Sequence, residues 1–178
     1  MRVLAADPSL TAYGWAVIDT SSPTPKLVAC GCIQTAPEKL KSGMKKKDLQ
    51  SKTDYDTVRA EAIASGLKKA ITDHNVTEVV FENPAGSKNA NAAAALKMVK
   101  GITIGVCAGA GVPSRGIRAR QVKGLLSDTS DTNAAKSEIM AKVREAFEEF
   151  DVLTNKWPKV RLEAASDAVG VYLGDQLR

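Results

Sequence analysis

The chain has 178 residues, of which 44% are hydrophobic and 25% charged, and its formal net charge is +5. This composition excludes disordered and fibrous proteins, and the length suits one domain over residues 1–178. No uninterrupted apolar run approaches the length of a membrane span, and Asp7 lies where a signal peptide needs apolar residues. We therefore expect a cytoplasmic protein without membrane contact, and the positive charge favours a polyanionic partner.

The first half of the chain predicts three strands, over residues 2–6, 14–19 and 27–35. Asp7-Pro8 ends the first strand because proline and the polar residues after it favour a turn. Short connections between the strands predict an antiparallel meander. A lysine-rich loop over 37–52 follows, and Thr53, with Asp56 three residues later, begins a helix that ends at His74.

The second half alternates strands and helices. The predicted strands cover 76–82 and 112–117, and the predicted helices cover 89–106, 121–123, 133–150 and 162–177. Three strands followed by alternating helices and strands predict an α/β fold, in which helices flank a mixed sheet.

The histidine and cysteine content narrows the chemistry. His74 is the only histidine, and its polar surroundings favour a surface role, so histidine-based zinc sites and Ser-His-Asp triads are excluded. The sequence has three cysteines, Cys30, Cys32 and Cys107, and no further cysteine or histidine at the spacing of a metal site. This pattern favours packing over metal binding. An enzyme of this composition must rely on carboxylates and hard cations.

Three carboxylates occupy informative positions. Asp7 and Glu82 each end a predicted apolar strand, and Asp167 lies on a helix of small and apolar residues, where an acid needs a partner or a metal. Taken singly, Asp7 could form a turn, Glu82 could end a solvated strand and Asp167 could face water. Together they form the set of oxygen ligands that two metal ions need around a phosphate.

Basic residues gather in three clusters, within 39–52, 115–123 and 156–161. One such cluster alone would be a solvated surface, but three clusters near or leading toward the carboxylates favour nucleic acid. The candidate DNA-binding residues are Lys45, Lys46, Lys47, Lys88, Asn89, Arg118, Arg120, Lys123 and Lys136.

The segment from Asp7 to Ile18 carries an aspartate–proline turn, a glycine and a second strand, and it resembles the opening of the RuvC family of Holliday-junction resolvases. The resemblance continues in order through Glu82, 88–91, 95–101, 120–123, 136–137 and 167–169. It spans most of the chain. It implies an RNase H-like fold, in which a three-stranded antiparallel meander and further parallel strands form the sheet.

The resemblance also implies an activity. A member of this family would be a crossover junction endodeoxyribonuclease of DNA recombination and repair, with two Mg²⁺ ions per active site and Mn²⁺ as a substitute. Asp7, Glu82 and Asp167 would hold the metals, and an activated water would leave 5′-phosphate and 3′-hydroxyl ends. Lys123 and Lys136 would contact the scissile or neighbouring phosphate, with solvated helix lysines as the alternative.

The same resemblance implies a homodimer that acts on four-way junctions, because two symmetric cuts need a twofold protein. The alanine-rich helix from Asn89 would form the dimer surface, and a buried intramolecular helix is the alternative.

Two departures from the family pattern concern the site. The family places a fourth acid or a histidine three residues before the last aspartate, where this chain has Ala164. Glu163 lies four residues before Asp167 and can share its helix face, so we name it as a tentative fourth ligand. The segment after Glu82 lacks an aromatic residue that many bacterial members carry, which leaves junction selectivity open. These departures, the lysine-rich loop and the insertion over 125–133 indicate a divergent member and are compatible with a phage origin.

Three other functions remain open at this point. The chain could be an RNase H-like nuclease for flaps or other branched DNA, or a DNA-binding module without activity, although retention of all three acids argues against the latter. An actin-like nucleotide-binding protein also begins with an aspartate in a hairpin. That fold needs a second, glycine-rich phosphate hairpin, which is not visible in the sequence.

Overall fold

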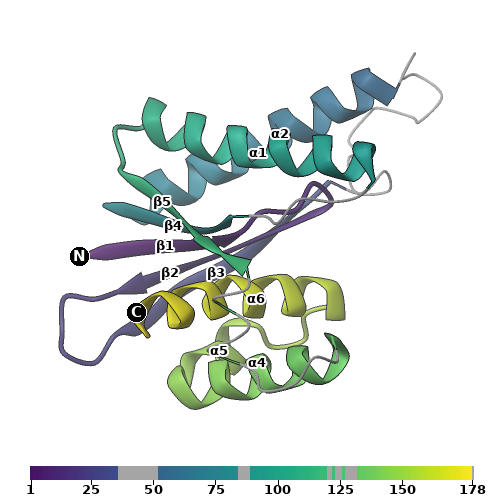
Figure 1. The fold of residues 1–178 in the computed structure, drawn as a ribbon. Helices are drawn as coiled ribbons and strands as arrows, with labels where there is room; N and C mark the ends of the chain where they lie inside the picture. The colour runs from purple at the N-terminus through teal and green to yellow at the C-terminus, as the bar shows by residue number, and fades with distance from the viewer. Residues whose placement is uncertain (36–51, 84–88, 120–121, 123–125, 127–131, 178) are drawn as a thin grey trace.

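The computed structural model describes residues 1–35, 52–83, 89–119, 122, 126 and 132–177. A five-stranded sheet forms the middle layer, and helices cover both of its faces (Figure 1). The strands are β1 (Arg2–Asp7), β2 (Ala12–Asp19), β3 (Lys26–Gln34), β4 (Glu78–Asn83) and β5 (Ser114–Arg118). The helices are α1 (Lys52–Asp73), α2 (Ala90–Gly109), α4 (Thr132–Ala146), α5 (Glu149–Leu153) and α6 (Lys159–Gln176).

The sheet is mixed, with the strand order β3-β2-β1-β4-β5. β1 and β3 both pair with β2 in antiparallel fashion, whereas β4 pairs in parallel with β1 and with β5. This is the predicted meander extended by parallel strands, and the α/β prediction is confirmed.

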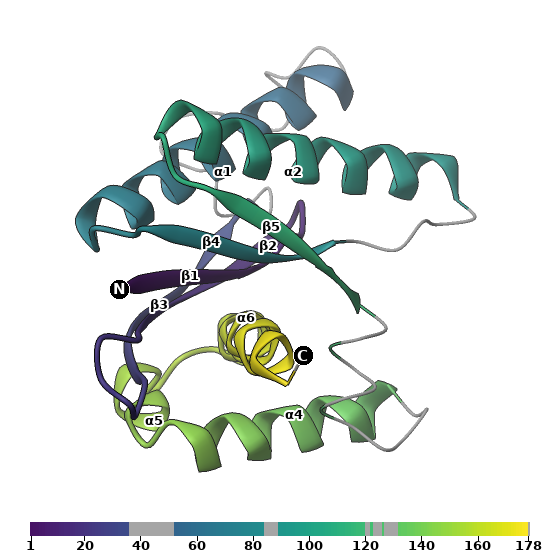
Figure 2. The same cartoon turned by 60° about the vertical axis from the view of Figure 1, so that its left-hand side comes forward.

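The sheet separates two apolar cores, one on each face. Along β1, Val3 and Ala5 face the core under α4, α5 and α6, whereas Leu4 and Ala6 face the core under α1 and α2. Successive side chains of a strand point to opposite faces, so a strand covered on both faces has to be apolar at every position. Figure 2 shows α1 and α2 on one side of the sheet and α4, α5 and α6 on the other.

Several element boundaries differ from the predicted ones. The predicted strand over 76–82 begins only at Glu78, because Asn75 takes a left-handed conformation (φ 50°) and the Val76 amide still donates to the Ile71 carbonyl, which closes α1. The predicted helix over 133–150 is two helices, α4 and α5, and the break lets Phe147 and Phe150 both enter the core. α6 begins at Lys159, three residues before the predicted start. The predicted helix over 121–123 lies largely outside the described residues.

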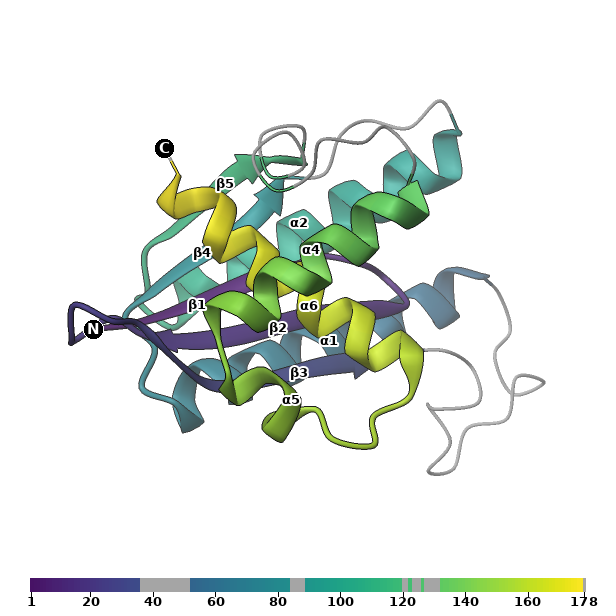
Figure 3. The same cartoon turned by 90° about the horizontal axis from the view of Figure 1, so that it is seen from below.

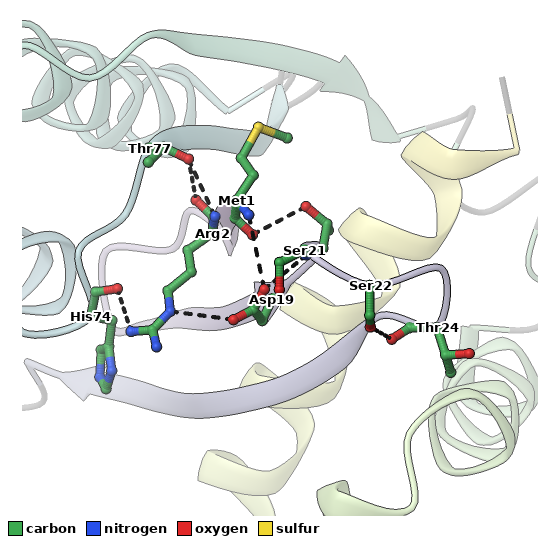
Figure 4. Close-up of polar contacts among 9 residues, drawn as sticks. Met1, Arg2, Asp19, Ser21, Ser22, Thr24, His74 and Thr77 are labelled. Carbon is green, nitrogen blue, oxygen red and sulfur yellow. Dashed lines mark hydrogen bonds and ion pairs between the residues drawn. The ribbon is translucent and has the colours of Figure 1, made fainter.

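The sheet end that carries the N-terminus is closed by polar contacts (Figure 4). Arg2 donates to the backbone carbonyl of His74 at 2.9 Å and lies 3.7 Å from the carboxylate of Asp19, while the Thr77 hydroxyl donates to the Arg2 carbonyl at 3.0 Å. The His74 ring lies 5.8 Å from the Trp15 ring between centroids. His74 therefore has a structural role near Arg2, at the end of β1 that is remote from Asp7.

α2 has an unusual surface for a helix of its composition. It is long and apolar enough to cross a membrane by length and composition alone, and only 17% of its apolar window, which contains Lys97 and Lys100, is buried in the structure. Its buried residues are Val99, Thr103 and Cys107, which face α1 and the sheet. The exposed positions of this helix are mostly alanine and glycine, with Asn91, Lys97 and Ile104 among them.

Candidate active site

Two of the three predicted acids lie side by side on neighbouring strands. β1 and β4 run in parallel with Ala6 opposite Phe81, so Asp7 and Glu82 are the next residues on each strand. Both acids share the face of Ala5 and Val80, which belong to the core under α6. Pro8 follows Asp7 and provides no backbone donor, which ends β1 at the acid.

Asp167 reaches the same place from α6. The backbone carbonyl of Ala164 lies so close to Gly14 that a Cβ at position 14 would stand 2.0 Å from that oxygen. Gly14 is the register partner of Asp7 on β2. The absence of a side chain at Gly14 therefore lets α6 lie directly on the sheet and brings Asp167, one turn after Ala164, toward Asp7.

The three acids line one cleft of about 140 Å³. Val122, Ala135, Lys136 and Ile139 complete its wall. The acids come from β1, β4 and α6, and the lysine comes from α4, so four separate elements build the cleft. The structure thus brings the three predicted site residues to one cleft, and their role as metal ligands stays a prediction.

Among the described residues that line this cleft, the cation is Lys136. Its ammonium donates to a Glu163 oxygen at 3.1 Å, and its side chain is 44% exposed. The hydrogen bond to Glu163, followed by the negative charges of Asp167, Glu163 and Asp7, holds the pKa of Lys136 above its ordinary value. Lys136 therefore stays positively charged and faces the acids.

Glu163 lines the neighbouring cleft between α4 and α6, and it is absent from the wall shared by the other three acids. Its carboxylate is 3.1 Å from the Lys136 ammonium and 3.6 Å from that of Lys159. The hydrogen bond from Lys136, aided by both lysine charges, holds the pKa of Glu163 below its ordinary value. The structure thus gives Glu163 two lysine partners, whereas Ala164 is buried against β2.

The donor set fits a hard divalent cation. Carboxylate oxygens are the ligands that Mg²⁺ prefers, and three like-charged groups around one small cleft favour a bound cation. Among the described residues, no three His, Cys, Asp or Glu side chains are placed close enough to hold one ion directly. Asp7, Glu82 and Asp167 would have to turn toward a common centre within their shared cleft.

Of the predicted DNA-binding residues, Arg118, Asn89 and Lys136 lie in the described part of the chain. Arg118 is exposed at the end of β5, where its register partner is Asn83, the residue after Glu82. Asn89 caps α2, because its side chain accepts hydrogen bonds from the amides of Asn91 and Ala92. Those that lie outside the described residues are Lys45, Lys46, Lys47, Lys88, Arg120 and Lys123.

The cysteines are free thiols. Cys107 is buried, and Cys30 packs against the core under α6. Burial raises the pKa of Cys30 and of Cys32 to about 11, which disfavours the thiolate that a metal site needs. Cys30 and Cys107 therefore pack against the two cores, and Cys32 is partly buried on the same strand as Cys30.

Two features of this region were missed by the sequence reasoning. Arg144 has no role among the sequence predictions. Arg144 lies eight residues after Lys136 on the same helix, and this spacing indicates that the two side chains share one face. The buried carboxylate of Asp175 near the end of α6 pairs with Arg115 of β5, and no local pattern links residues 60 positions apart.

A family model described as crossover junction endodeoxyribonuclease RuvC matches residues 3–173, which include all three acids, Lys136 and Glu163. The chain belongs to the RuvC family. A RuvC from Methylococcus capsulatus is 30% identical over 141 residues, covering 78% of this chain and 74% of that protein. A RuvC from Shewanella piezotolerans is 25% identical over 169 residues, covering 95% and 83%.

Solved structures of RuvC and of another resolvase share this RuvC-family fold. T. thermophilus RuvC in complex with a Holliday junction substrate has a TM-score of 0.68 at 20% identity, covering 98% of this chain and 92% of that one. The fowlpox virus Holliday junction resolvase has a TM-score of 0.57 at 15% identity, covering 100% of both chains. The RNase H-like fold that the resemblance implied is therefore confirmed.

Proposed function

We propose that this RuvC-family chain is a structure-selective DNA endonuclease that resolves Holliday junctions. The observation that carries the proposal is the convergence of Asp7, Glu82 and Asp167 on one cleft beside Lys136. The family is one of metal-dependent nucleases, and such a cleft supplies the oxygen ligands that this chemistry needs.

Asp7, Glu82 and Asp167 would hold the metal, which we propose to be two Mg²⁺ ions, with Mn²⁺ as a substitute. When bound, such ions supply an activated water and stabilise the leaving oxygen. The water adds to phosphorus as the bond to the 3′ oxygen breaks, and that oxygen leaves as a hydroxyl. The products are a 5′-phosphate and a 3′-hydroxyl.

Lys136 is proposed to bind a non-bridging oxygen of the scissile phosphate. Its ammonium lines the cleft, stays charged, and is held by Glu163 rather than left to rotate in solvent. A fixed cation stabilises the negative charge that grows on the phosphate oxygens during attack. Lys123 has the same proposed role. We propose that Glu163 positions Lys136, because its carboxylate has two lysine partners, and a role as fourth metal ligand stays the alternative.

We further propose that two copies associate through α2, since a four-way junction needs two symmetric cuts. Gly101, Gly105 and Gly109 recur every four residues on the exposed side of this helix, and a Cβ at any of them would meet nothing within 4 Å. Such a row lets a second helix approach closely. A DNA substrate of this kind puts the proposed site of action in the cytoplasm of a bacterial or phage-infected cell.

The decisive experiment incubates the purified protein with labelled four-way junction, flap and plain duplex, with and without Mg²⁺. We expect paired cuts in the junction that require the metal, with 5′-phosphate and 3′-hydroxyl ends. Faster cutting of the flap would replace the resolvase proposal by a flap nuclease. Binding without any cutting, across Mg²⁺ and Mn²⁺, would leave a DNA-binding module.

A further inference from the structure

A second cleft adjoins the one that holds the three acids. It has a volume of about 420 Å³, lies between α4 and α6, and is lined by Lys136, Ser137, Met140, Arg144, Lys159 and Glu163. We call it the α4–α6 groove. Lys136 lines both clefts, so the groove begins at the cation nearest the acids and leads away from them along α4. Figure 3 shows α4 and α6 crossing on this side of the sheet.

The groove is basic. Among the described residues that line it, those at positions 136, 144 and 159 are cations, and the one acid is Glu163, which is ion-paired with the two lysines. Arg144 pairs with Asp151 at 2.9 Å, but both side chains are about half exposed or more, at 48% and 61%. Exposed pairs of this kind contribute little, so a phosphate can replace Asp151 as the partner of Arg144. Lys159 is 87% exposed and can reach the same phosphates.

The spacing along α4 matches a nucleic-acid strand. Lys136, Met140 and Arg144 follow one another at intervals of four residues and form one row on the helix. Eight residues correspond to about 12 Å along the helix axis. At roughly 3.4 Å of rise per nucleotide of one strand along the duplex axis, this length covers three to four nucleotides of a duplex whose axis runs parallel to α4. Half-buried Met140, between the two cations, offers an apolar contact for a sugar.

We propose that the α4–α6 groove binds the sugar–phosphate backbone of the cleaved strand, with Arg144 and Lys159 on phosphates three to four nucleotides from the scissile one. The inference rests on the proposed function, because Lys136 is what joins the groove to the cleft of the acids. We expect the groove to bind the cleaved DNA strand and not an acidic protein segment. The row of cations begins at Lys136, which is proposed to bind the scissile phosphate, so the backbone of that strand can continue along the row.

The test compares a double variant, Arg144→Gln with Lys159→Gln, against the wild type and a matched control. The control is Lys142→Gln with Lys26→Gln, which removes the same two charges from exposed positions outside the groove. Binding of an uncut four-way junction and of one isolated duplex arm is measured over a range of salt concentrations, with a chelator present. Each phosphate contact contributes about 0.9 to the slope of log K against log salt, so the groove variant should lose about 1.8 of that slope. The control should keep the wild-type slope.

A second measurement places the contact on the DNA. Neutral methylphosphonate linkages are put three to four nucleotides from the scissile phosphate, on each side in turn. We expect them on one side to weaken binding by the wild type and to have no further effect on the groove variant. The proposal that the groove binds DNA would be wrong if the groove variant and the control had equal slopes of log K against log salt. It would also be wrong if the wild type and the groove variant were equally sensitive to the neutral linkages. Wild-type cleavage that favours flaps would overturn the resolvase proposal while the slope difference still supports the groove.

Discussion

The residues around the cleft differ in their contacts, and these contacts indicate different roles. Asp7, Glu82 and Asp167 share one cleft with Lys136, whereas Glu163 is turned toward Lys136 and Lys159. The strand-end acids could be predicted, because apolar strands that stop at an acid place it at the sheet edge. The partners of Glu163 could not, because Lys136 is 27 residues away and only the packing of α4 on α6 brings them together.

The clearest residue-scale prediction concerns the three acids. Asp7→Asn, Glu82→Gln and Asp167→Asn should each abolish cleavage and leave junction binding within a few-fold, because each removes a proposed metal ligand while the basic surface survives. Cleavage and binding are measured on the same labelled junction. Asp19→Asn, at the opposite end of the sheet, serves as the control and should cut normally. Near wild-type cutting by any of the three variants would contradict the site assignment.

Glu163→Gln separates two roles for that residue. We expect a several-fold slower reaction, because Lys136 loses the partner that holds it, with an unchanged Mg²⁺ concentration for the half-maximal rate. The measurement is a Mg²⁺ titration of the cleavage rate, with Lys159→Gln as the control for the second ion pair. A clearly raised Mg²⁺ requirement in Glu163→Gln alone would instead make Glu163 the fourth metal ligand.

The Glu163–Lys136 pair also predicts a pH dependence of stability. The folded-state pKa of Glu163 is lowered from its ordinary value of 4.5, so the pair stabilises the fold above pH 4.5 and the stabilisation is lost as the pH falls through the lowered pKa. The melting temperatures of wild type and Glu163→Gln should therefore differ at pH 7 and converge as the pH falls below the lowered pKa of Glu163. High salt should shrink the difference at pH 7. A difference that persists after Glu163 has been protonated would assign the effect to packing.

At the scale of elements, the position of α6 matters most, because this helix carries both Asp167 and Glu163. Gly14 allows its close approach to β2, and the buried carboxylate of Asp175 pairs with both nitrogens of the Arg115 fork on β5. Arg115 also donates to Glu78 at 2.7 Å. These contacts join the far end of α6 to the parallel part of the sheet, so they fix the helix along its length.

Removal of the Arg115 side chain should therefore destabilise the protein. Arg115→Ala leaves the Asp175 carboxylate, which is 3% exposed, without its guanidinium. Because the Arg115 side chain is itself 42% exposed, the loss should stay below that of a fully buried pair and amount to about 2 kcal/mol. Arg144→Ala breaks a pair between exposed groups and should cost less than about 1 kcal/mol. Urea unfolding of the two variants gives the comparison. Equal losses would mean that Arg115 contributes no more than a surface ion pair.

The elements themselves could be predicted in order and type, and the errors lie where tertiary packing decides. Periodicity continues smoothly across the junction of α4 and α5, yet Phe147 and Phe150 both enter the core only if the helix breaks. Likewise, Val76 has the β-branched side chain of a strand but donates its amide to the end of α1. A local sequence pattern shows neither of these two boundaries, because core packing decides the first and a hydrogen bond to the preceding helix decides the second.

At the scale of the whole molecule, the acid cleft and α2 lie on different faces of the sheet. The cleft opens between the sheet, α4 and α6, whereas α2 lies with α1 on the opposite face (Figure 2). A second copy bound along α2 would therefore leave both clefts uncovered. This separation suits an enzyme in which two sites act on opposite strands of one junction.

The proposed association predicts the outcome of filling the glycine row of α2. A Cβ at Gly105 meets no atom within 4 Å in the single chain and the position is exposed, so Gly105→Leu should keep the fold, and the removal of a helix glycine should even raise the stability of the monomer by up to about 1 kcal/mol. The same side chain stands where a second α2 would approach, so the variant should sediment as a monomer at concentrations where the wild type is a dimer. Ala146→Leu, at an exposed position of α4, is the matched control and should remain a dimer. Because one cleft can cut one strand, the Gly105→Leu monomer should nick junctions without completing the paired cuts. A dimeric Gly105→Leu protein with unchanged paired cutting would remove α2 from the interface.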